Sequence, residues 1–219
     1  MKLVIFLTIG TIAMFAVMFI GNGSAPYRFR IWKLLLSTVV LTLAGVLGAY
    51  LMAWLESGSF GGRSFYGAVF LPPAIMAFTA LLLKLPAEKL IDLSAVGECI
   101  MLAILKVQCI RDGCCGGRPV INPFSGESFI FPSQEVELIN ALVIMVVLLL
   151  IISRRKNTGR IYPLYMIIYG ISRFVLNLFR DTSPFVWILP AGTFWSLISI
   201  AAGFLWLFVL RRTRNRKKA

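Results

Sequence analysis

Seven long apolar stretches constrain this chain more than any other feature of its 219 residues. Crossing a hydrocarbon core about 30 Å thick takes about 20 mostly apolar helical residues. The 59% hydrophobic content also exceeds that of soluble domains. The sequence therefore predicts an all-α polytopic integral membrane protein, a bundle of about seven transmembrane helices in residues 1–210 with a basic tail at 211–219. The predicted spans are about 3–20, 34–55, 66–83, 93–110, 136–153, 161–179 and 186–210.

The first apolar stretch has two interpretations. Residues 23–25, Gly-Ser-Ala, resemble a signal-peptidase cleavage site. The run before them is long for a signal peptide, and the cations Arg28, Arg30 and Lys33 that follow it would hinder export. We therefore expect the first stretch to remain as a membrane span.

Local signals predict where several helices begin, break or end. Pro72 and Pro73 cannot lie inside an undisturbed helix, so the third span should be broken or kinked there. The segment from Lys84 to Asp92 is expected to form a short charged turn. Ser133 directly precedes an apolar run, and we expect it to cap the fifth helix.

The distribution of lysine and arginine predicts the orientation of the bundle. With the N-terminus outside, fifteen cations fall on the cytoplasmic side and seven on the other. The positive-inside rule therefore places the N-terminus outside and the C-terminus in the cytoplasm. The seven remaining cations gather at the outer end of the predicted spans and are Lys2, Arg63, Lys106, Arg111, Arg118, Arg173 and Arg180.

The net charge of +13 does not indicate a nucleic-acid partner, because six of the cations follow the last apolar run. A basic tail after a membrane span is typical of the cytoplasmic side, where it contacts anionic lipid. Membrane lipids are therefore expected partners of the tail, and no nucleic acid is expected.

The stretch from Lys106 to Pro119 differs most from the apolar sequence around it. It holds one lysine, two arginines, three of the four cysteines and three glycines. Each ionisable group inside a bilayer costs several kcal/mol unless it is paired or hydrated, and glycine permits a positive φ. The stretch therefore predicts a tight loop whose amides and cations bind an anion.

The cysteines and the absence of histidine exclude some kinds of site. Cys99 is expected to be buried within a span. Cys109, Cys114 and Cys115 lie in the predicted loop without a CxxC pattern, so no metal site and no cofactor are expected. A disulfide between Cys109 and Cys114 is conceivable, and packed free thiols are the alternative.

Arg173, Asn177 and Arg180 share one face of the sixth span, because their spacing is four and three residues. This polar face should point into the bundle rather than into lipid. In the structural interpretation, Arg173 forms a salt bridge with Glu137 or Glu98. In the functional interpretation, the arginines hold a phosphate or a carboxylate, which guanidinium groups fit well.

Other polar residues offer partners for these arginines. Gln134, Glu137 and Asn140 lie near one face of the fifth span, and we expect Glu137 and Asn140 to contact the arginines. Tyr66 is either an aromatic residue at the membrane interface or a hydroxyl that bonds a substrate oxygen.

Five short motifs follow one another along residues 64–196. They are Ser64-Phe65-Tyr66-Gly67, Lys106-x-x-Cys109-x-x-x-Gly113-Cys114-Cys115-x-Gly117, Phe131-Pro132-Ser133-Gln134 followed by Glu137, Tyr169-Gly170-x-x-Arg173-Phe174-x-x-Asn177-x-x-Arg180, and Gly192-Thr193-Phe194-Trp195-Ser196. In this order they resemble the signature of the prolipoprotein diacylglyceryl transferase family. The chain departs from that signature at Lys106, where the family has arginine, and at Asn177, where it has glutamate. It also departs at Cys114, where forms of the family without the Cys-Cys pair have glutamate, and at Tyr66, where many members have histidine.

The resemblance implies transfer of a diacylglyceryl group from phosphatidylglycerol to the lipobox cysteine thiol of prolipoproteins, at the outer leaflet of the bacterial cell membrane. The implied partners are phosphatidylglycerol and lipobox-containing signal peptides. Either Tyr66 or Glu137 would assist the thiol. We assign catalytic roles to Tyr66, Glu137, Arg173 and Arg180, and phospholipid binding to Lys106, Arg111, Gly113, Gly117, Arg118 and Asn177.

Two other classes of function stay open from the sequence. One is a paralogue that transfers lipid to another acceptor. The other is a non-enzymatic membrane protein that binds or transports phospholipid.

Overall fold

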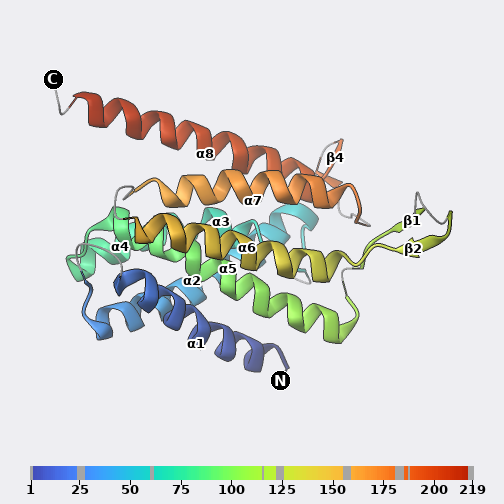
Figure 1. The fold of residues 1–219 in the computed structure, drawn as a ribbon, viewed down its shortest axis with the longest axis horizontal. Coiled ribbons are helices and arrows are strands. Elements are labelled where there is room, and N and C mark those ends of the chain that lie inside the picture. The colour runs from blue at the N-terminus through green and yellow to red at the C-terminus, as the bar shows by residue number, and fades with distance from the viewer. Residues whose placement is uncertain are drawn as a thin grey trace.

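The protein is a bundle of helices that run along one common direction (Figure 1). The computed structural model describes residues 2–23, 28–59, 62–114, 116–121, 126–154, 159–180, 185–186 and 188–216. The predicted all-α membrane class is confirmed. The helices are α1 (Lys2–Gly23), α2 (Ile31–Ser57), α3 (Gly67–Phe70), α4 (Pro72–Leu83), α5 (Ala87–Asp112), α6 (Ser133–Ser153), α7 (Ile161–Asn177) and α8 (Ala191–Arg216).

The break predicted in the third span is confirmed. Leu71 separates α3 from α4, and Pro72 and Pro73 take the first two positions of α4, where a missing backbone donor does no harm. Since α3 and α4 together replace one span, the described residues contain the seven helical units that the apolar stretches predict.

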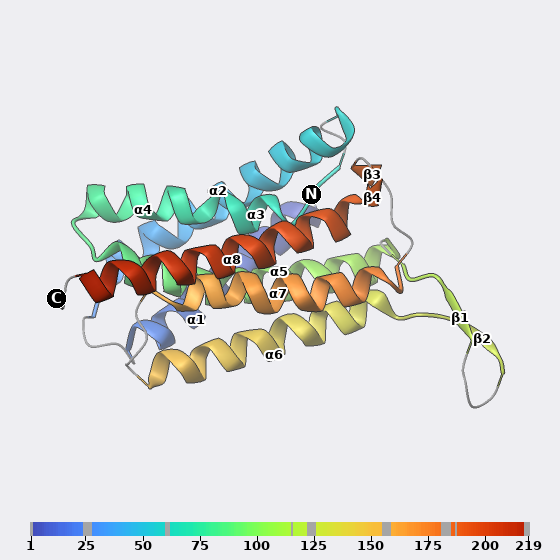
Figure 2. The ribbon, with the colours of Figure 1, turned by 90° about the horizontal axis from the view of Figure 1, so that it is seen from above.

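Four helices, α1, α2, α6 and α8, are long and apolar enough to cross a membrane on their own. The helix α5 lies inside the bundle, where it packs against α1, α2, α4, α6 and α7 (Figure 2). It carries buried Lys89, Asp92, Glu98 and Lys106. The neighbouring helices shield these groups from lipid, which allows a less apolar helix in the centre.

The charged turn predicted for residues 84–92 is wrong, because α5 already begins at Ala87. Asp92 is buried within this helix and accepts hydrogen bonds from the amides of Gly159 (2.5 Å), Ile161 (3.0 Å) and Tyr162 (3.1 Å). The first amides of a helix have no intrahelical acceptor, and a carboxylate there also interacts favourably with the helix dipole. Asp92 of α5 thus caps α7.

Two small hairpins were not predicted. In the loop before α6, β1 (Pro119–Ile121) pairs antiparallel with β2 (Ser128–Ile130), with Val120 opposite Phe129. Before α8, β3 (Phe185–Val186) pairs with β4 (Leu189–Pro190). Strands of two or three residues are too short to show an alternating pattern. Both hairpins lie at the same end of the bundle (Figure 1).

Helix ends also differ from expectation. Pro132 takes the N-cap position of α6, so Ser133 is the first helical residue and not the cap. The basic tail is a continuation of α8 as far as Arg216. Residues 24–25 of the cleavage-site pattern and residues 217–219 of the tail lie outside the described residues.

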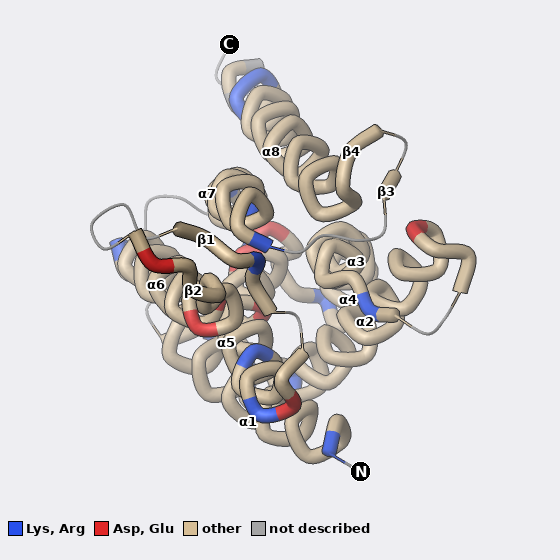
Figure 3. Tube along the Cα trace, turned by 90° about the vertical axis from the view of Figure 1, so that its right-hand side faces the viewer, with Lys and Arg blue, Asp and Glu red and all other residues tan. Residues whose placement is uncertain are grey.

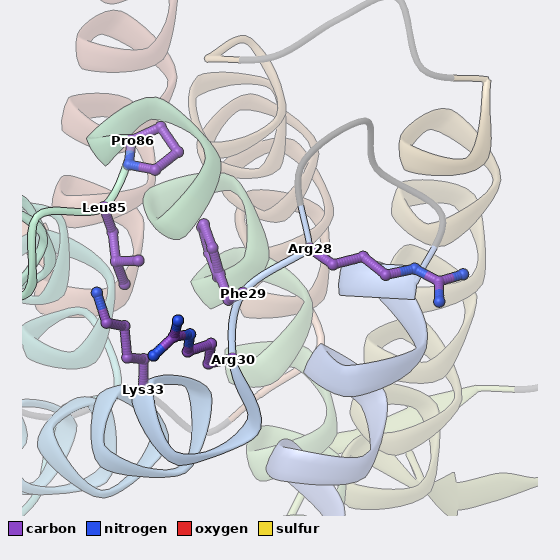
Figure 4. A pocket seen from close by; sticks show the side chains of 6 residues that line it. All are labelled: Arg28, Phe29, Arg30, Lys33, Leu85 and Pro86. Carbon is purple, nitrogen blue, oxygen red and sulfur yellow. The ribbon is translucent and has the colours of Figure 1, made fainter.

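The two ends of the bundle carry different sets of cations. At the hairpin end, seen in Figure 3, Lys2 pairs with Asp112 at 3.3 Å. At the opposite end a cavity of about 370 Å³ is lined by Arg28, Phe29, Arg30, Lys33, Leu85 and Pro86. The side chains of Arg30 and Lys33 lie beside one another there, with Nζ of Lys33 donating to the carbonyl of Leu83 at 2.6 Å, and Arg28 points away (Figure 4). The sequence assigns Lys2 to one side of the membrane and Arg28, Arg30 and Lys33 to the other. In the structure these two sets lie at opposite ends of the bundle.

The close contact of α2 with α3 gives a test of the packing. A Cβ on Gly48 would overlap the carbonyl oxygen of Gly67, whereas a Cβ on Gly45 would lie 3.7 Å from the Cβ of Ala68. We expect Gly48→Ala to destabilise the protein by about 1–3 kcal/mol. Gly45→Ala should have no cost, because alanine favours a helix by about 1 kcal/mol over glycine. Thermal denaturation in detergent compares the two variants, and equal midpoints would contradict the packing.

Candidate functional site

A single carboxylate, Glu137 of α6, pairs with three cations at the hairpin end. One carboxylate oxygen contacts Nη1 of both Arg173 and Arg180, and the other oxygen contacts Nζ of Lys106. All four side chains are at least four-fifths buried. The predicted pairing of Arg173 with Glu137 is therefore confirmed, and it is part of a larger cluster, which we call the Glu137 cluster.

Three helices supply this cluster. Glu137 lies in the second turn of α6 and Lys106 near the C-terminal end of α5. Arg173 and Asn177 lie four residues apart in the last turns of α7. Side chains at this spacing share one helical face, which here points toward α5 and α6.

Arg180 reaches the cluster from outside the helix. The α7 helix ends at Asn177, and Arg180 forms an isolated antiparallel bridge with Gly117. The amide of Arg118 donates to the carbonyl of Phe179 at 3.1 Å. A Cβ on Gly117 would overlap the carbonyl oxygen of Phe131, so the chain can approach this closely only with glycine at that position.

A cavity of about 410 Å³ lies beside the Glu137 cluster. Its walls combine the polar end of α7 with the end of α2 and the segment that follows it. The lining residues are Ala53, Glu56, Ser57, Ser59, Gly62, Arg63, Ser64, Phe65, Tyr66, Tyr169, Arg173, Asn177, Arg180, Ala191 and Gly192. Glu137 and Lys106 are not among them, so the cavity wall receives only the two arginines of the cluster.

Several polar atoms on the cavity wall lack a protein partner. Neither Nε of Arg173 nor the oxygen and nitrogen of the Asn177 amide has a hydrogen-bond partner among the described residues. Asn177 is only 7% exposed. Unsatisfied buried polar groups are unfavourable in a folded protein, and both residues line the cavity. A ligand with acceptor oxygens in the cavity would satisfy Nε of Arg173 and the nitrogen of the Asn177 amide, and a hydroxyl on the same ligand could donate to the amide oxygen.

The charge of the cluster has the same implication. Three cations around one carboxylate leave an excess of two positive charges in a buried site. Buried charges are costly unless they are paired and hydrogen-bonded. A single structural salt bridge needs one cation, so the two additional cations indicate a site for an anion.

Tyr66 is buried within the protein. It is 3% exposed, and its ring packs against that of Tyr169 with 5.7 Å between centroids. Its hydroxyl lies 2.5 Å from the Oγ of Ser196, which itself lies 2.6 Å from the carbonyl oxygen of Gly192. Since Ser196 donates to that carbonyl, the Tyr66 hydroxyl donates to Ser196. Its proton is therefore engaged within the protein.

Of the six residues assigned to phospholipid binding, only Asn177 lines the cavity. Lys106 contacts Glu137 instead. Arg111 is exposed, and its guanidinium lies 5.9 Å from the ring centroid of Phe6. Gly113 ends α5 with a φ of +63°, as expected for a glycine in a tight turn. Gly117 and Arg118 instead contribute the backbone contacts that hold the segment of Arg180.

Other predicted contacts are also corrected. Asn140 does not contact an arginine, because its amide donates to the Oγ of Ser172 at 3.0 Å. The side-chain amide of Gln134 donates to the carbonyl of Cys114. Glu98, the alternative partner of Arg173, instead accepts hydrogen bonds from the hydroxyl of Tyr162 at 3.0 and 3.1 Å.

The three described cysteines do not line the cavity. Cys99 is buried, as expected. Cys109 belongs to α5 and not to a loop. Cys114 is exposed and forms no disulfide, and Cys115 lies outside the described residues.

Two residues of the site were missed. Ser196 is the last residue of the fifth sequence motif, Gly192 to Ser196, and this motif could have identified it. Glu56 lines the cavity near the end of α2 and accepts a hydrogen bond from Ser64. Its sequence context, an acidic residue after an apolar run, is equally typical of a solvated helix end.

The chain is similar in sequence to proteins named as phosphatidylglycerol–prolipoprotein diacylglyceryl transferases. A protein named phosphatidylglycerol–prolipoprotein diacylglyceryl transferase 2 from Clostridium perfringens (strain 13 / Type A) is 25% identical over 210 residues, which cover 85% of this chain and 82% of that protein. Phosphatidylglycerol–prolipoprotein diacylglyceryl transferases from Clostridium tetani (strain Massachusetts / E88) and Dehalococcoides mccartyi (strain ATCC BAA-2266 / KCTC 15142 / 195) are each 28% identical over 141 residues, or 59% of this chain. The chain spans just over half the length of these last two relatives, 55% and 54%.

The comparison with protein families covers nearly the whole chain. Residues 5–209 match the family described as prolipoprotein diacylglyceryl transferase. This range includes at least the greater part of each of the seven helical units and every residue of the Glu137 cluster. The chain is therefore a member of the prolipoprotein diacylglyceryl transferase family.

Proposed function

We propose that this protein transfers the diacylglyceryl group of phosphatidylglycerol to the thiol of the lipobox cysteine in bacterial prolipoproteins. Membership of the family and the names of its relatives support this function. The observation that carries it is the Glu137 cluster, whose excess of positive charge lies beside a cavity of about 410 Å³.

The reaction requires stabilisation of a developing negative charge on phosphate. The thiol sulfur attacks the glycerol carbon of the diacylglyceryl group, and the bond from that carbon to the phosphate oxygen breaks. The phosphodiester, with one negative charge, leaves as glycerol phosphate with two. Cations fixed beforehand at the place where charge develops lower the barrier most effectively.

The residues of the cavity wall have separate roles in this proposal. Arg173 and Arg180 line the cavity and bind the phosphate oxygens, and the free amide of Asn177 donates an additional hydrogen bond. Glu137 holds both guanidinium groups in position. Lys106 is a positioning residue, because it contacts the second oxygen of Glu137 and does not line the cavity.

The distribution of lysine and arginine along the chain supports an orientation with the N-terminus outside and the C-terminus in the cytoplasm. With the N-terminus outside, the hairpin end and its cavity lie at the outer leaflet, where exported prolipoproteins arrive. The basic end of α8 then contacts anionic lipid on the cytoplasmic side. Phosphatidylglycerol and the lipobox signal peptide both reach the cavity from within the membrane.

The direct test uses the purified protein, vesicles containing phosphatidylglycerol and a lipobox peptide. We expect a diacylglyceryl-modified peptide and free glycerol phosphate, both detected by mass spectrometry. Complementation of a strain that lacks the transferase should restore lipid attachment to a reporter lipoprotein. Consumption of lipid without peptide modification would indicate another acceptor, and lipid binding without turnover would indicate a non-enzymatic protein.

Substitutions of Arg173 separate a phosphate ligand from a structural ion pair. Arg173→Lys keeps the charge opposite Glu137 but loses the planar fork, and Arg173→Gln loses both. We expect transfer to fall in both variants, by about 10²–10³-fold for Arg173→Gln, with a higher KM for phosphatidylglycerol in Arg173→Lys.

The control for these substitutions is Lys2→Gln, which removes the exposed ion pair with Asp112 and should leave transfer unchanged. Thermal midpoints in detergent show whether each variant is folded. Full transfer by Arg173→Lys would show that Arg173 only pairs with Glu137.

The orientation is tested by thiol labelling in intact cells. In a variant whose four native cysteines are replaced by serine, Ser128→Cys on β2 should react with a membrane-impermeant reagent, because β2 is predicted to lie outside. Arg154→Cys, after α6, should react only once the cells are opened. The reverse pattern would place the cavity at the cytoplasmic leaflet and contradict the proposed access of prolipoproteins.

A further inference from the structure

The cavity contains one carboxylate that the Glu137 cluster does not use. Glu56 lies near the C-terminal end of α2, and its Oε1 accepts a hydrogen bond from the Oγ of Ser64 at 2.6 Å. It lines the same cavity as Arg173, Arg180 and the amide of Asn177. Among the described residues, no lysine or arginine lies within ion-pair distance of it.

A thiol acceptor needs a group that takes its proton, because the thiolate is the nucleophile. The chain has no histidine. Both oxygens of Glu137 are engaged by cations, which makes this carboxylate a poor proton acceptor. The hydroxyl of Tyr66 is bonded to Ser196 and buried. Neither of the two groups expected to assist the thiol is therefore available.

We propose that Glu56 is the general base that removes the proton from the acceptor thiol. The proposal rests on the proposed function of the protein. In this step the thiol proton passes to the Glu56 carboxylate, and the sulfur forms a bond to the glycerol carbon. The carbon–oxygen bond to phosphate breaks, and the leaving phosphate keeps the electron pair. Glu56 then releases its proton to the phosphate or to water.

The position of Glu56 suits this role. The cations Arg173 and Arg180 come from the end of α7, and Glu56 comes from the end of α2. The cavity therefore receives two arginines for the phosphate from the end of α7 and, from another helix, a carboxylate outside the Glu137 cluster for the acceptor. The amide of Ser64 donates to the carbonyl of Ala49 at 3.0 Å, which fixes the residue that orients Glu56.

The experiment compares two acceptor peptides, one with cysteine and one with selenocysteine at the same position. A selenol is a stronger acid than a thiol and is ionised at neutral pH, so it needs no base. With the cysteine peptide, Glu56→Gln should lower kcat about 10²–10⁴-fold, the usual contribution of a general base. With the selenocysteine peptide it should differ from the wild type by only a few-fold.

A pH profile provides a second readout. Without a base, the rate of Glu56→Gln on the cysteine peptide should rise about tenfold per pH unit up to the thiol pKa of about 8.5. The wild-type rate should depend less on pH in this range. The KM for phosphatidylglycerol should be the same in both, because Glu56 is not proposed to bind the phosphate.

Two further variants control for folding and for charge. Glu135→Gln removes an exposed carboxylate in the first turn of α6 and should change nothing. Ser64→Ala removes only the hydrogen bond to Glu56. With the cysteine peptide it should lower kcat less than Glu56→Gln does, and with the selenocysteine peptide its kcat should again be close to that of the wild type. It keeps the proposal testable if Glu56→Gln does not fold.

The outcomes distinguish the two proposals. If Glu56→Gln slows both peptides equally, Glu56 holds the structure and is not a base, although the transferase function stands. If Ser64→Ala and Glu56→Gln both leave the cysteine reaction unchanged, another group takes the proton. If the wild type modifies neither peptide, the proposed function itself is wrong, and the role of Glu56 fails with it.

Discussion

The contact of the Glu137 carboxylate with three cations is the interaction on which this end of the bundle depends. Through Lys106, Arg173 and Arg180 it joins α6 to α5, to α7 and to the segment after α7. None of these charged groups is stable alone in an apolar interior, because removing one partner of a buried pair leaves an uncompensated charge. The ends of the helices are thus positioned by electrostatics, while apolar packing holds their remaining length.

A contribution to the stability of the folded protein does not by itself explain the composition of the Glu137 cluster. Buried salt bridges are weak contributors to stability, since desolvation offsets much of the attraction. Here the cations outnumber the carboxylate, and Arg173 and Asn177 present unsatisfied polar atoms to a cavity. A bound phosphate group accounts for the excess charge and for the missing partners of the two donors, Nε of Arg173 and the nitrogen of the Asn177 amide. The site is prepared for an anion, which is the property that a phospholipid transferase requires.

Features that depend on local sequence could be predicted, and features that depend on how helices are rotated against each other could not. Apolar length and paired prolines predicted the helical units and the break before α4. The pairing of Arg173 with Glu137 was predictable because both are costly anywhere except inside the bundle. Arg111, in contrast, follows Lys106 by five residues, a rotation of about 140° around the helix, and so faces α1. Glu56 carries no local signal, since only the folded structure brings it to the cavity.

The most direct test of the central claim is an experimental structure of the protein with phosphatidylglycerol bound. We expect the phosphate to lie in the cavity, within hydrogen-bond distance of Arg173, Arg180 and the amide of Asn177. We also expect that Lys106 remains on Glu137 and does not contact the lipid. A phosphate bound instead among Arg28, Arg30 and Lys33 at the opposite end, with the cavity beside Glu137 empty, would contradict the account.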